Sequence, residues 1–281
     1  MRRLACLALA SCCVASASSA QDSGALPSPE EVANKDMVTI AVGGAWLTDY
    51  VGSDDYRIIP AVAIRGKVNG FSFTTRGAYL YFDAIPHRGA SSVELNVGPM
   101  AGVRLNRTGH VDDDIVNLLP DRNTAIELGG FAGVSFHRLT NPYDTLALRL
   151  DVLHDVANAH ESTTFSPNLD FSTPLSRTTY VSANLGAEFV SNRFADYYYS
   201  ISPADSLASG LPVFNADGGM KDWKLSLLLN QSITGDLLHG FSVFGTGQYS
   251  RLVGDFKRSP IVAQRGSASQ WLGAAGVTYT W

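Results

Sequence analysis

Hydrophobic and polar positions alternate with a period of two along most of this chain. At the C-terminus Trp271, Val277, Tyr279 and Trp281 share one face, and Thr278 lies on the other. The same alternation recurs in ten segments, which cover residues 37–46, 57–65, 71–81, 93–104, 126–137, 146–152, 181–189, 223–229, 241–249 and 271–281. Period two is typical of β-strands with one apolar face.

The alternation is typical both of a soluble β-sandwich and of a transmembrane β-barrel, and the length of the strands distinguishes the two. A soluble β-sandwich also alternates, but its strands average about 5–6 residues. These segments reach the length that a tilted strand needs to cross a bilayer. The sequence therefore predicts a transmembrane antiparallel up-and-down β-barrel whose apolar parity faces lipid, including Phe71, Phe73, Tyr79 and Tyr81 in one segment.

Aromatic residues near strand ends agree with a membrane barrel. They would form the interfacial girdles of such a barrel, and they are Trp46, Tyr81, Phe136, Trp223, Tyr249, Trp271 and Trp281. The chain also ends on an alternating strand. That ending suits a fold whose first and last strands must meet.

The strand number is predicted as 10–12. Bacterial single-chain barrels have an even number of strands. The count is ten if 194–201 belongs to a loop. It is twelve if 194–201 is an eleventh strand and one more lies within 156–177 or 253–269. These two segments, with 105–124 and 202–219, otherwise have the Pro, Gly, Asn, Asp and Ser content of loops.

The N-terminus has the pattern of an export signal. Met1-Arg2-Arg3 is a short basic start, an apolar stretch follows, and small residues precede a predicted cleavage between Ala20 and Gln21. A lipoprotein with Cys12 as its modified residue is the alternative. The predicted organisation is a signal peptide over 1–20, a periplasmic lead-in over 21–36 and the outer-membrane barrel over 37–281.

Cysteine and charge limit the function classes. All three cysteines lie within the predicted signal peptide, which excludes a disulfide framework or a cysteine nucleophile in the mature chain. The chain has 21 basic and 26 acidic residues with no basic cluster, so nucleic acid is not an expected partner. Charged residues make up only 17% of the chain, which is low for a soluble protein.

Candidate chemistry is sparse. The one grouping of hydrolase type is His154-Asp155 and His160-Glu161 with Ser162. His154 and His160 are also considered as metal ligands, but their spacing fits no standard site. Asp112-Asp113-Asp114 has the composition of a hard-cation site or of a solvated loop. We expect no catalytic residues, metal or cofactor, and no nucleotide-binding fingerprint occurs.

The inward parity of the strands carries charges of both signs. Six are basic and four acidic, and they are Arg57, Arg65, Arg76, Glu94, Arg104, Glu127, Arg149, Asp151, Glu188 and Lys224. We expect them to neutralise one another, because an unpaired charge in a narrow interior is costly. The alternative is a polar pore with a weak preference for anions.

Several motifs resemble the MipA/OmpV family of outer-membrane proteins. They comprise the segment from Tyr50 through Gly52, Ser53 and Asp54; Tyr199 with Ser202-Pro203 and Gly210-Leu211; Arg251-Leu252; and Ser259-Pro260. The final strand ends in Trp281, where the family more commonly has Phe. The resemblance covers about 37–281, and Gly52-Ser53-Asp54 also has the composition of a tight turn.

The resemblance implies a non-catalytic scaffold in the outer membrane. One family member is described as linking a lytic transglycosylase to a peptidoglycan synthase. Expected partners are thus outer-membrane lipids and a murein hydrolase or synthase on the periplasmic side. A narrow channel for small solutes is the alternative function, and an outer-membrane hydrolase is a third.

Overall fold

A computed structural model describes residues 28–281 except for 88 and 90. The predicted signal peptide and its cleavage between Ala20 and Gln21 lie outside the described residues. In the described part of the chain, no helix is both long enough and apolar enough to cross a membrane.

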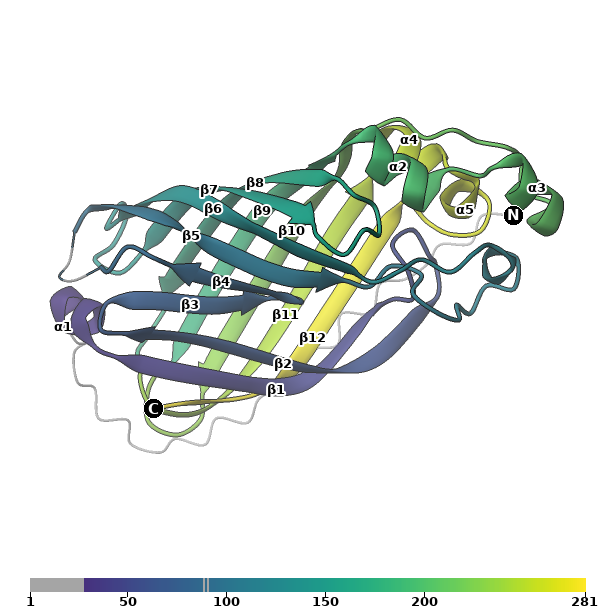
Figure 1. The fold of residues 1–281 in the computed structure, drawn as a ribbon. Helices are drawn as coiled ribbons and strands as arrows, with labels where there is room; N and C mark the ends of the chain where they lie inside the picture. The colour runs from purple at the N-terminus through teal and green to yellow at the C-terminus, as the bar shows by residue number, and fades with distance from the viewer. Residues whose placement is uncertain (1–27, 88, 90) are drawn as a thin grey trace.

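Twelve antiparallel strands close into one barrel, and each strand is hydrogen-bonded to its neighbours in sequence (Figure 1). The barrel closes where Thr39–Leu47 of the first strand pairs with Leu272–Thr280 of the last. The strands are β1 (Met37–Thr48), β2 (Tyr56–Val68), β3 (Phe71–Arg76), β4 (Tyr79–Asp83), β5 (Val93–Arg104), β6 (Ala125–His137), β7 (Thr145–Asp155), β8 (Thr163–Pro174), β9 (Thr179–Val190), β10 (Gly219–Ser232), β11 (Gly240–Leu252) and β12 (Ser269–Thr280).

The helices are short and lie beyond the strand ends. They are α1 (Pro29–Asn34), the 3₁₀ helix η1 (Val116–Leu118), α2 (Asn192–Tyr199), α3 (Pro203–Ser209), α4 (Gly254–Arg258) and α5 (Pro260–Ala263). Figure 1 shows α2 to α5 together at one end of the barrel and α1 at the other. Long loops gather at the end with α2 to α5, and short turns at the end with α1. Outer-membrane barrels have long extracellular loops and short periplasmic turns, and by this rule we assign the α1 end to the periplasm.

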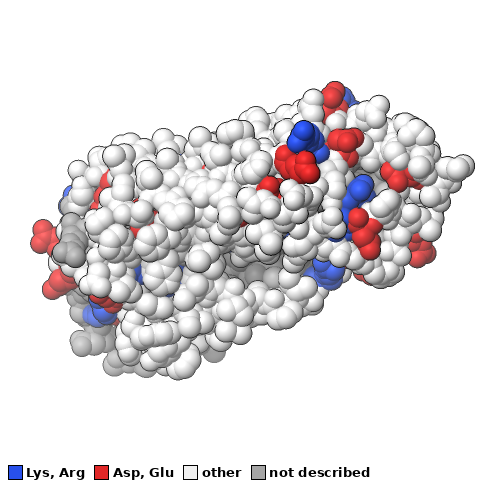
Figure 2. Space-filling view, in the orientation of Figure 1, with Lys and Arg blue, Asp and Glu red and all other residues white. Residues whose placement is uncertain are grey.

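The outer surface has the band of apolar residues that lipid requires. Exposed aliphatic side chains from strands around the barrel include Val42, Ile58, Leu95, Leu148, Leu185, Leu227 and Val277. In Figure 2 the charged side chains gather towards the two ends of the visible face, and the surface between them is almost uncharged. The predicted all-β membrane fold is thereby confirmed.

Aromatic contacts border this band at both ends. At the extracellular end the rings of Trp46 and Tyr56 stack at 4.2 Å, and Tyr249 lies 4.8 Å from Trp271. At the periplasmic end the ring contacts include Phe71 with Phe82, Phe241 with Tyr279, and Tyr279 with Trp281. Amphipathic rings favour the membrane interface, so the two groups mark its outer and inner limits.

The predicted lipid-facing parity is wrong for Tyr79 and Tyr81. The segment 71–81 is two strands, β3 and β4, because the chain reverses at Gly77, where φ is +58°. The reversal turns both tyrosines into the lumen, where Tyr81 is buried, and turns Leu80 and Phe82 outward. Tyr81 is therefore not part of an aromatic girdle.

The twelfth strand lies in one of the segments proposed for it. β8 falls within 156–177, and the split of 71–81 provides the other additional strand. The alternative segment 253–269 instead contains α4 and α5, and 194–201 lies mostly in α2.

Leu148 provides a test of the parity. It lies on the lipid face of β7 and is 51% exposed, whereas Ala147 points to the other face. Leu148→Arg should lower the free energy of unfolding in lipid vesicles by about 2–4 kcal/mol, the cost of arginine near the midplane. Ala147→Arg should be much milder, because position 147 faces the lumen, directly opposite Asp170 in the register of β7 and β8. Equal effects on urea unfolding or on heat-modifiable gel mobility would contradict the assigned faces.

Candidate functional site

A buried cluster of charges lies in the lumen below the extracellular end. Arg104 of β5 contacts Glu127 of β6 at 2.9 Å and Glu188 of β9 at 2.8 Å. Glu188 also pairs with Lys221. The hydroxyl of Tyr79 donates to Glu127 at 2.5 Å, and Glu127 is 0% exposed. The carboxylates and cations therefore neutralise one another away from water, as a low-dielectric interior requires.

A second cluster bridges the barrel at mid-height. Arg76 of β3 contacts Asp170 of β8 at 2.9 Å, and Arg149 of β7 contacts Asp170 at 2.8 Å and Asp151 at 2.7 Å. The Tyr81 hydroxyl donates to Asp151 at 3.0 Å. β3 and β8 are five positions apart in a ring of twelve strands. A direct contact between them means that side chains bridge the lumen at this level.

A third cluster lies near the periplasmic turns. Glu94 lies 3.4 Å from His87 and 3.3 Å from His137. His87 also lies 3.2 Å from Asp83, which accepts a hydrogen bond from Asn96 at 2.8 Å. This cluster joins β4, β5 and β6 on the inner face.

Three of the predicted lumen charges stand apart from these clusters. Arg57 pairs with Asp49 at 3.0 Å at the extracellular end of β2, and its side chain is 46% exposed. Arg65 lies over the ring of Tyr180, across the lumen, at 5.7 Å. Within the described residues no carboxylate lies at ion-pair distance from Arg65 or Lys224. The other seven predicted lumen charges belong to the three clusters.

Several cluster members were not predicted from the sequence. They are Tyr79, Tyr81, Asp83, His87, His137, Asp170, Lys221 and Asp222. Asp170 was missed because β8 was not recognised, although Phe165, Leu169 and Phe171 alternate there with Asn168 and Asp170. Lys221 and Asp222 lie at a β-bulge, which breaks the period-two pattern on which the prediction relied.

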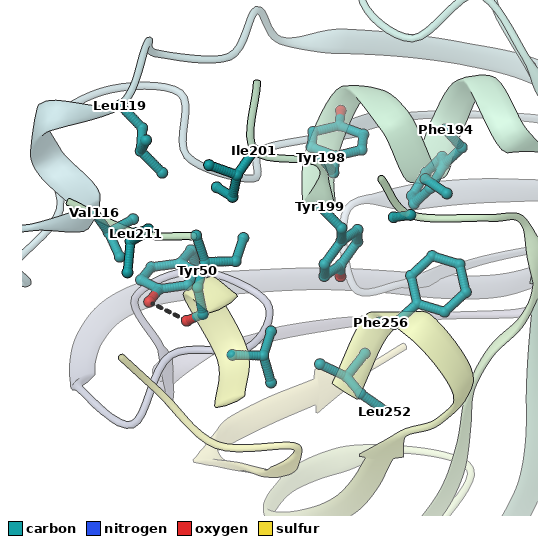
Figure 3. Packing of buried hydrophobic residues seen from close by; sticks show 14 of the residues in the cluster. Tyr50, Val116, Leu119, Phe194, Tyr198, Tyr199, Ile201, Leu211, Leu252 and Phe256 are labelled. Atoms are coloured by element: carbon teal, nitrogen blue, oxygen red, sulfur yellow. Dashed lines mark hydrogen bonds between the residues drawn. The ribbon is translucent and has the colours of Figure 1, made fainter. Parts of the chain in front are cut away.

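A packed apolar core, which we call the extracellular cap, covers the end of the barrel with the long loops (Figure 3). Its fully buried members come from loops far apart in sequence and include Tyr50, Val116, Phe194, Tyr198, Tyr199, Ile201, Leu252, Phe256 and Ile261. Residues with this burial resemble the core of a soluble domain. The loops thus form a folded unit over the mouth.

The residues that resemble the MipA/OmpV family gather in this cap. The Tyr50 hydroxyl lies 3.2 Å from the carbonyl oxygen of Ile261, and the Ser259 hydroxyl donates to the Tyr199 carbonyl at 2.6 Å. Ser202 and Pro203 begin α3, and Gly210 ends it in the left-handed conformation. Leu211, Leu252 and Pro260 are buried, whereas Asp54 and Arg251 are exposed.

Gly52 and Ser53 join the first loop to the start of β12. The Gly52 amide donates to Gln270 Oε1 at 3.0 Å, and Gln270 Nε2 donates to the Ser53 carbonyl at 2.9 Å. Gly52 has φ +111°, and a Cβ there would lie 2.5 Å from Val262. The position therefore needs glycine both for its backbone and for close packing.

Burial in the cap shifts the pKa values of its ionisable groups. Burial lowers the pKa of the Arg107 guanidinium to about 10, and the neighbouring charge of Arg122 contributes in the same direction. Burial raises the pKa of the Tyr199 hydroxyl to about 12. For Asp113 burial opposes ionisation, but hydrogen bonds from Arg265 and from the Val116 amide outweigh it and lower the pKa. Asp113 therefore stays ionised and holds loop 105–124 to loop 253–268.

The predicted hydrolase grouping forms a hydrogen-bond chain that anchors a loop. His160 contacts Ser162 at 2.8 Å through Nδ1 and Glu127 at 3.0 Å through Nε2. The His160 side chain is 0% exposed and packs against the rings of Phe194 and Tyr198. Ser162 is also buried, so the chain of contacts ties loop 156–162 to the barrel wall and to the cap.

The described residues contain no group of three or more His, Cys, Asp or Glu side chains that could hold a metal ion. Asp113 instead pairs with Arg265 and accepts hydrogen bonds from the Ile115 and Val116 amides. Within the acidic segment 112–114, Asp113 therefore has a structural role, because these contacts hold loop 105–124 in its conformation.

The upper cluster provides a stability test. Glu188→Gln would leave Arg104 and Lys221 without one carboxylate, and breaking a buried pair costs about 3–5 kcal/mol. Arg193→Ala is the matched control. Its ion pair with Glu161 is exposed at 73% and 58%, and such surface pairs contribute about 0–1 kcal/mol. Denaturant unfolding should separate the two variants, and similar losses would show that the cluster is not buried in the folded protein.

Comparison with known proteins places the chain in a family. The sequence model of the family described as "MltA-interacting protein MipA" matches residues 40–281. The curated proteins named "MltA-interacting protein" from Escherichia coli (strain K12) and Shigella flexneri are each 31% identical over 101 residues. That alignment covers 35% of this chain and 37% of each relative, so the chain matches only about a third of the length of these relatives.

A solved porin and a solved outer-membrane channel resemble this chain only weakly. A NanC porin structure gives a TM-score of 0.45 at 11% identity and covers 85% of this chain and 98% of its own. The COG4313 outer membrane channel from Pseudomonas putida F1 gives 0.47 at 10% identity, with 93% and 98% covered. Because the family match extends over nearly the whole barrel, this chain belongs to the MipA family of outer-membrane proteins.

Proposed function

We propose that this protein is a non-conducting outer-membrane scaffold that holds a murein hydrolase or synthase on its periplasmic side. The observation that carries the proposal is the obstruction of the barrel axis. Ion pairs such as Arg76–Asp170 bridge the lumen, and the cap covers the extracellular mouth. A barrel obstructed in this way leaves its two rims as working surfaces.

The periplasmic rim has an ordered surface on which a partner could dock. The lead-in that contains α1 is hydrogen-bonded to three parts of this rim. Asn34 accepts from the Gly89 amide at 2.8 Å, Asp36 accepts from the Asn69 amide at 2.8 Å, and Lys35 donates to the Leu238 carbonyl at 3.3 Å. These contacts hold the lead-in against the turns on the side where the cell wall lies.

The class of partner rests on the relatives. Two curated relatives are named for interaction with MltA, and the family resemblance implies enzymes that cut or synthesise peptidoglycan. A narrow channel for small solutes is the second candidate. Arg65 and Lys224 favour it, because no described carboxylate lies within ion-pair distance of either and such charges line a polar path.

Deletion of residues 24–34 tests the docking surface. The deletion removes no strand residue, so the barrel should still fold and show heat-modifiable mobility. Crosslinking and affinity pull-down from envelopes should recover a murein enzyme with the full chain and much less with the deletion. Leu207→Ser is the matched control, because Leu207 is 90% exposed on α3 at the opposite end, and it should leave recovery unchanged.

Planar-bilayer recording separates the scaffold from the channel. The purified protein should give little or no steady conductance if the lumen is filled. Large, reproducible single-channel steps, together with altered solute uptake in a strain that lacks the protein, would contradict the scaffold and support the channel.

A further inference from the structure

The wall of the barrel is incomplete above the β3–β4 hairpin. β2 has 13 residues, but β3 pairs only with Arg65–Val68 of it. β4 pairs with β5 over three residues. The hairpin tip at Gly77 stops partway along β2, and a Cβ there would meet no atom within 4 Å. Figure 1 shows the short hairpin between the longer β2 and β5.

The upper edge of β2 consequently lacks a partner. Thr75 Oγ1 accepts from the Ile64 amide at 2.9 Å and lies 3.2 Å from its carbonyl oxygen, and among the described residues this is the last hydrogen-bonded contact along the edge. In the described part of the chain, no strand pairs with this edge over Tyr56–Ala63. Pro60 lies on this stretch, and proline, which has no N–H, occurs in sheets at such edges. Ile58 and Val62 are 77% and 70% exposed.

The gap has a defined border, and we call it the lateral window. β2 forms one side. The end of β5 forms the other, where the Val103 amide donates to the Ala78 carbonyl at 3.3 Å. Above, loops 49–55 and 105–124 meet through Val51 with Asn106 and through Asp112 with Asp49, each at 3.0 Å.

The lateral window lies at the depth of the outer leaflet. Its upper limit is the stacked pair Trp46 and Tyr56, which marks the outer interface. Its lower limit, the hairpin tip, lies level with the middle of β2. Unpaired backbone groups at this depth occur in membrane proteins only where they border protein or a water-filled cavity. The window therefore connects the hydrocarbon to the lumen beneath the cap.

The lumen side of the window has a charged upper end and an apolar lower part. Arg57, next to Tyr56, is 46% exposed and contacts Asp49 through Nη1. The guanidinium group has further N–H donors for a second anion. Below it the inward positions of β2 are Ile59, Ala61 and Ala63, and Ile59 is 38% exposed. This order matches an amphiphile in the outer leaflet, whose head group is at the interface and whose chain points inward.

We propose that the lateral window admits a single-chain amphiphile with an anionic head group from the outer leaflet. The head group binds the Arg57 guanidinium, and the alkyl chain lies along Ile59 and Ala63 between β2 and the hairpin tip. The cap blocks the axial route, so the lumen is reached through the wall. The proposal does not depend on the scaffold function, because the window faces lipid and the proposed docking surface faces the periplasm.

Fluorescence quenching from the lipid phase tests this proposal. The predicted mature chain has no cysteine, so single-cysteine variants can carry one bimane label each. The test variant is Ile59→Cys. Ser226→Cys, facing the lumen behind a complete wall, and Leu227→Cys, facing lipid, are matched controls on β10. Each is reconstituted in vesicles and titrated with stearate that bears a nitroxide in mid-chain, after heat-modifiable mobility confirms folding.

We expect quenching at position 59 to approach that at 227 and to exceed that at 226. Adding Arg57→Gln should shift the titration at 59 to about tenfold higher stearate, which corresponds to the loss of one charge-assisted hydrogen bond. The nitroxide stearate methyl ester, which has no charge, should quench at 59 weakly and without dependence on Arg57.

Two results would overturn the proposal. Quenching at 59 no stronger than at 226 would mean that lipid chains do not enter the window. Equal quenching by stearate and its methyl ester, unchanged by Arg57→Gln, would mean that chains enter without recognition of an anionic head group.

Discussion

Hydrogen bonding of the backbone is the constraint on which this structure depends. Hydrocarbon offers no partner for an amide or a carbonyl, so a β-sheet in a membrane must close on itself. The pairing of β1 with β12 satisfies this requirement and joins residues more than 200 positions apart. The period-two pattern follows, because each strand then has one face towards lipid and one towards the lumen. The upper edge of β2 is the described exception, and the proposed lateral window arises from it.

The lumen and the cap follow from the same closure. A ring of twelve strands leaves an interior that side chains can span, and charges there are stable only when paired. The cross-lumen contacts of Arg104 and Arg76 satisfy this condition. At the extracellular end the loops extend beyond the sheet, and they bury Tyr198, Tyr199 and Phe256 in a core of their own. The bridged lumen, the covered mouth and the ordered α1 rim are the observations that support the proposed scaffold.

Period two was sufficient to predict the barrel but not every strand. In the sequence, Tyr79 and Tyr81 lie at the same alternating positions as Phe71. Only the reversal of the chain at Gly77 turns them inward. β8 contains Pro167 and Asp170, which gave 156–177 a loop-like composition. Local spacing could not show that Arg76 meets Asp170, because the register of distant strands decides that contact. The family-like residues were found as separate motifs, and their assembly into one cap depends on loop contacts such as Tyr50 with Ile261.

The most direct test is amide hydrogen exchange, resolved to single residues, for the protein in lipid nanodiscs. We predict slow exchange for strand amides around the ring, including Ile40 and Val42 of β1, which face β12 with the same parity as Val38, whose amide donates to Trp281. Faster exchange should be confined, among membrane-depth strand amides, to the unpaired edge of β2 at Ile58 and Val62. Protection of these two amides equal to that of β1 would contradict an incomplete wall, and fast exchange at the β1–β12 seam would contradict the closed barrel.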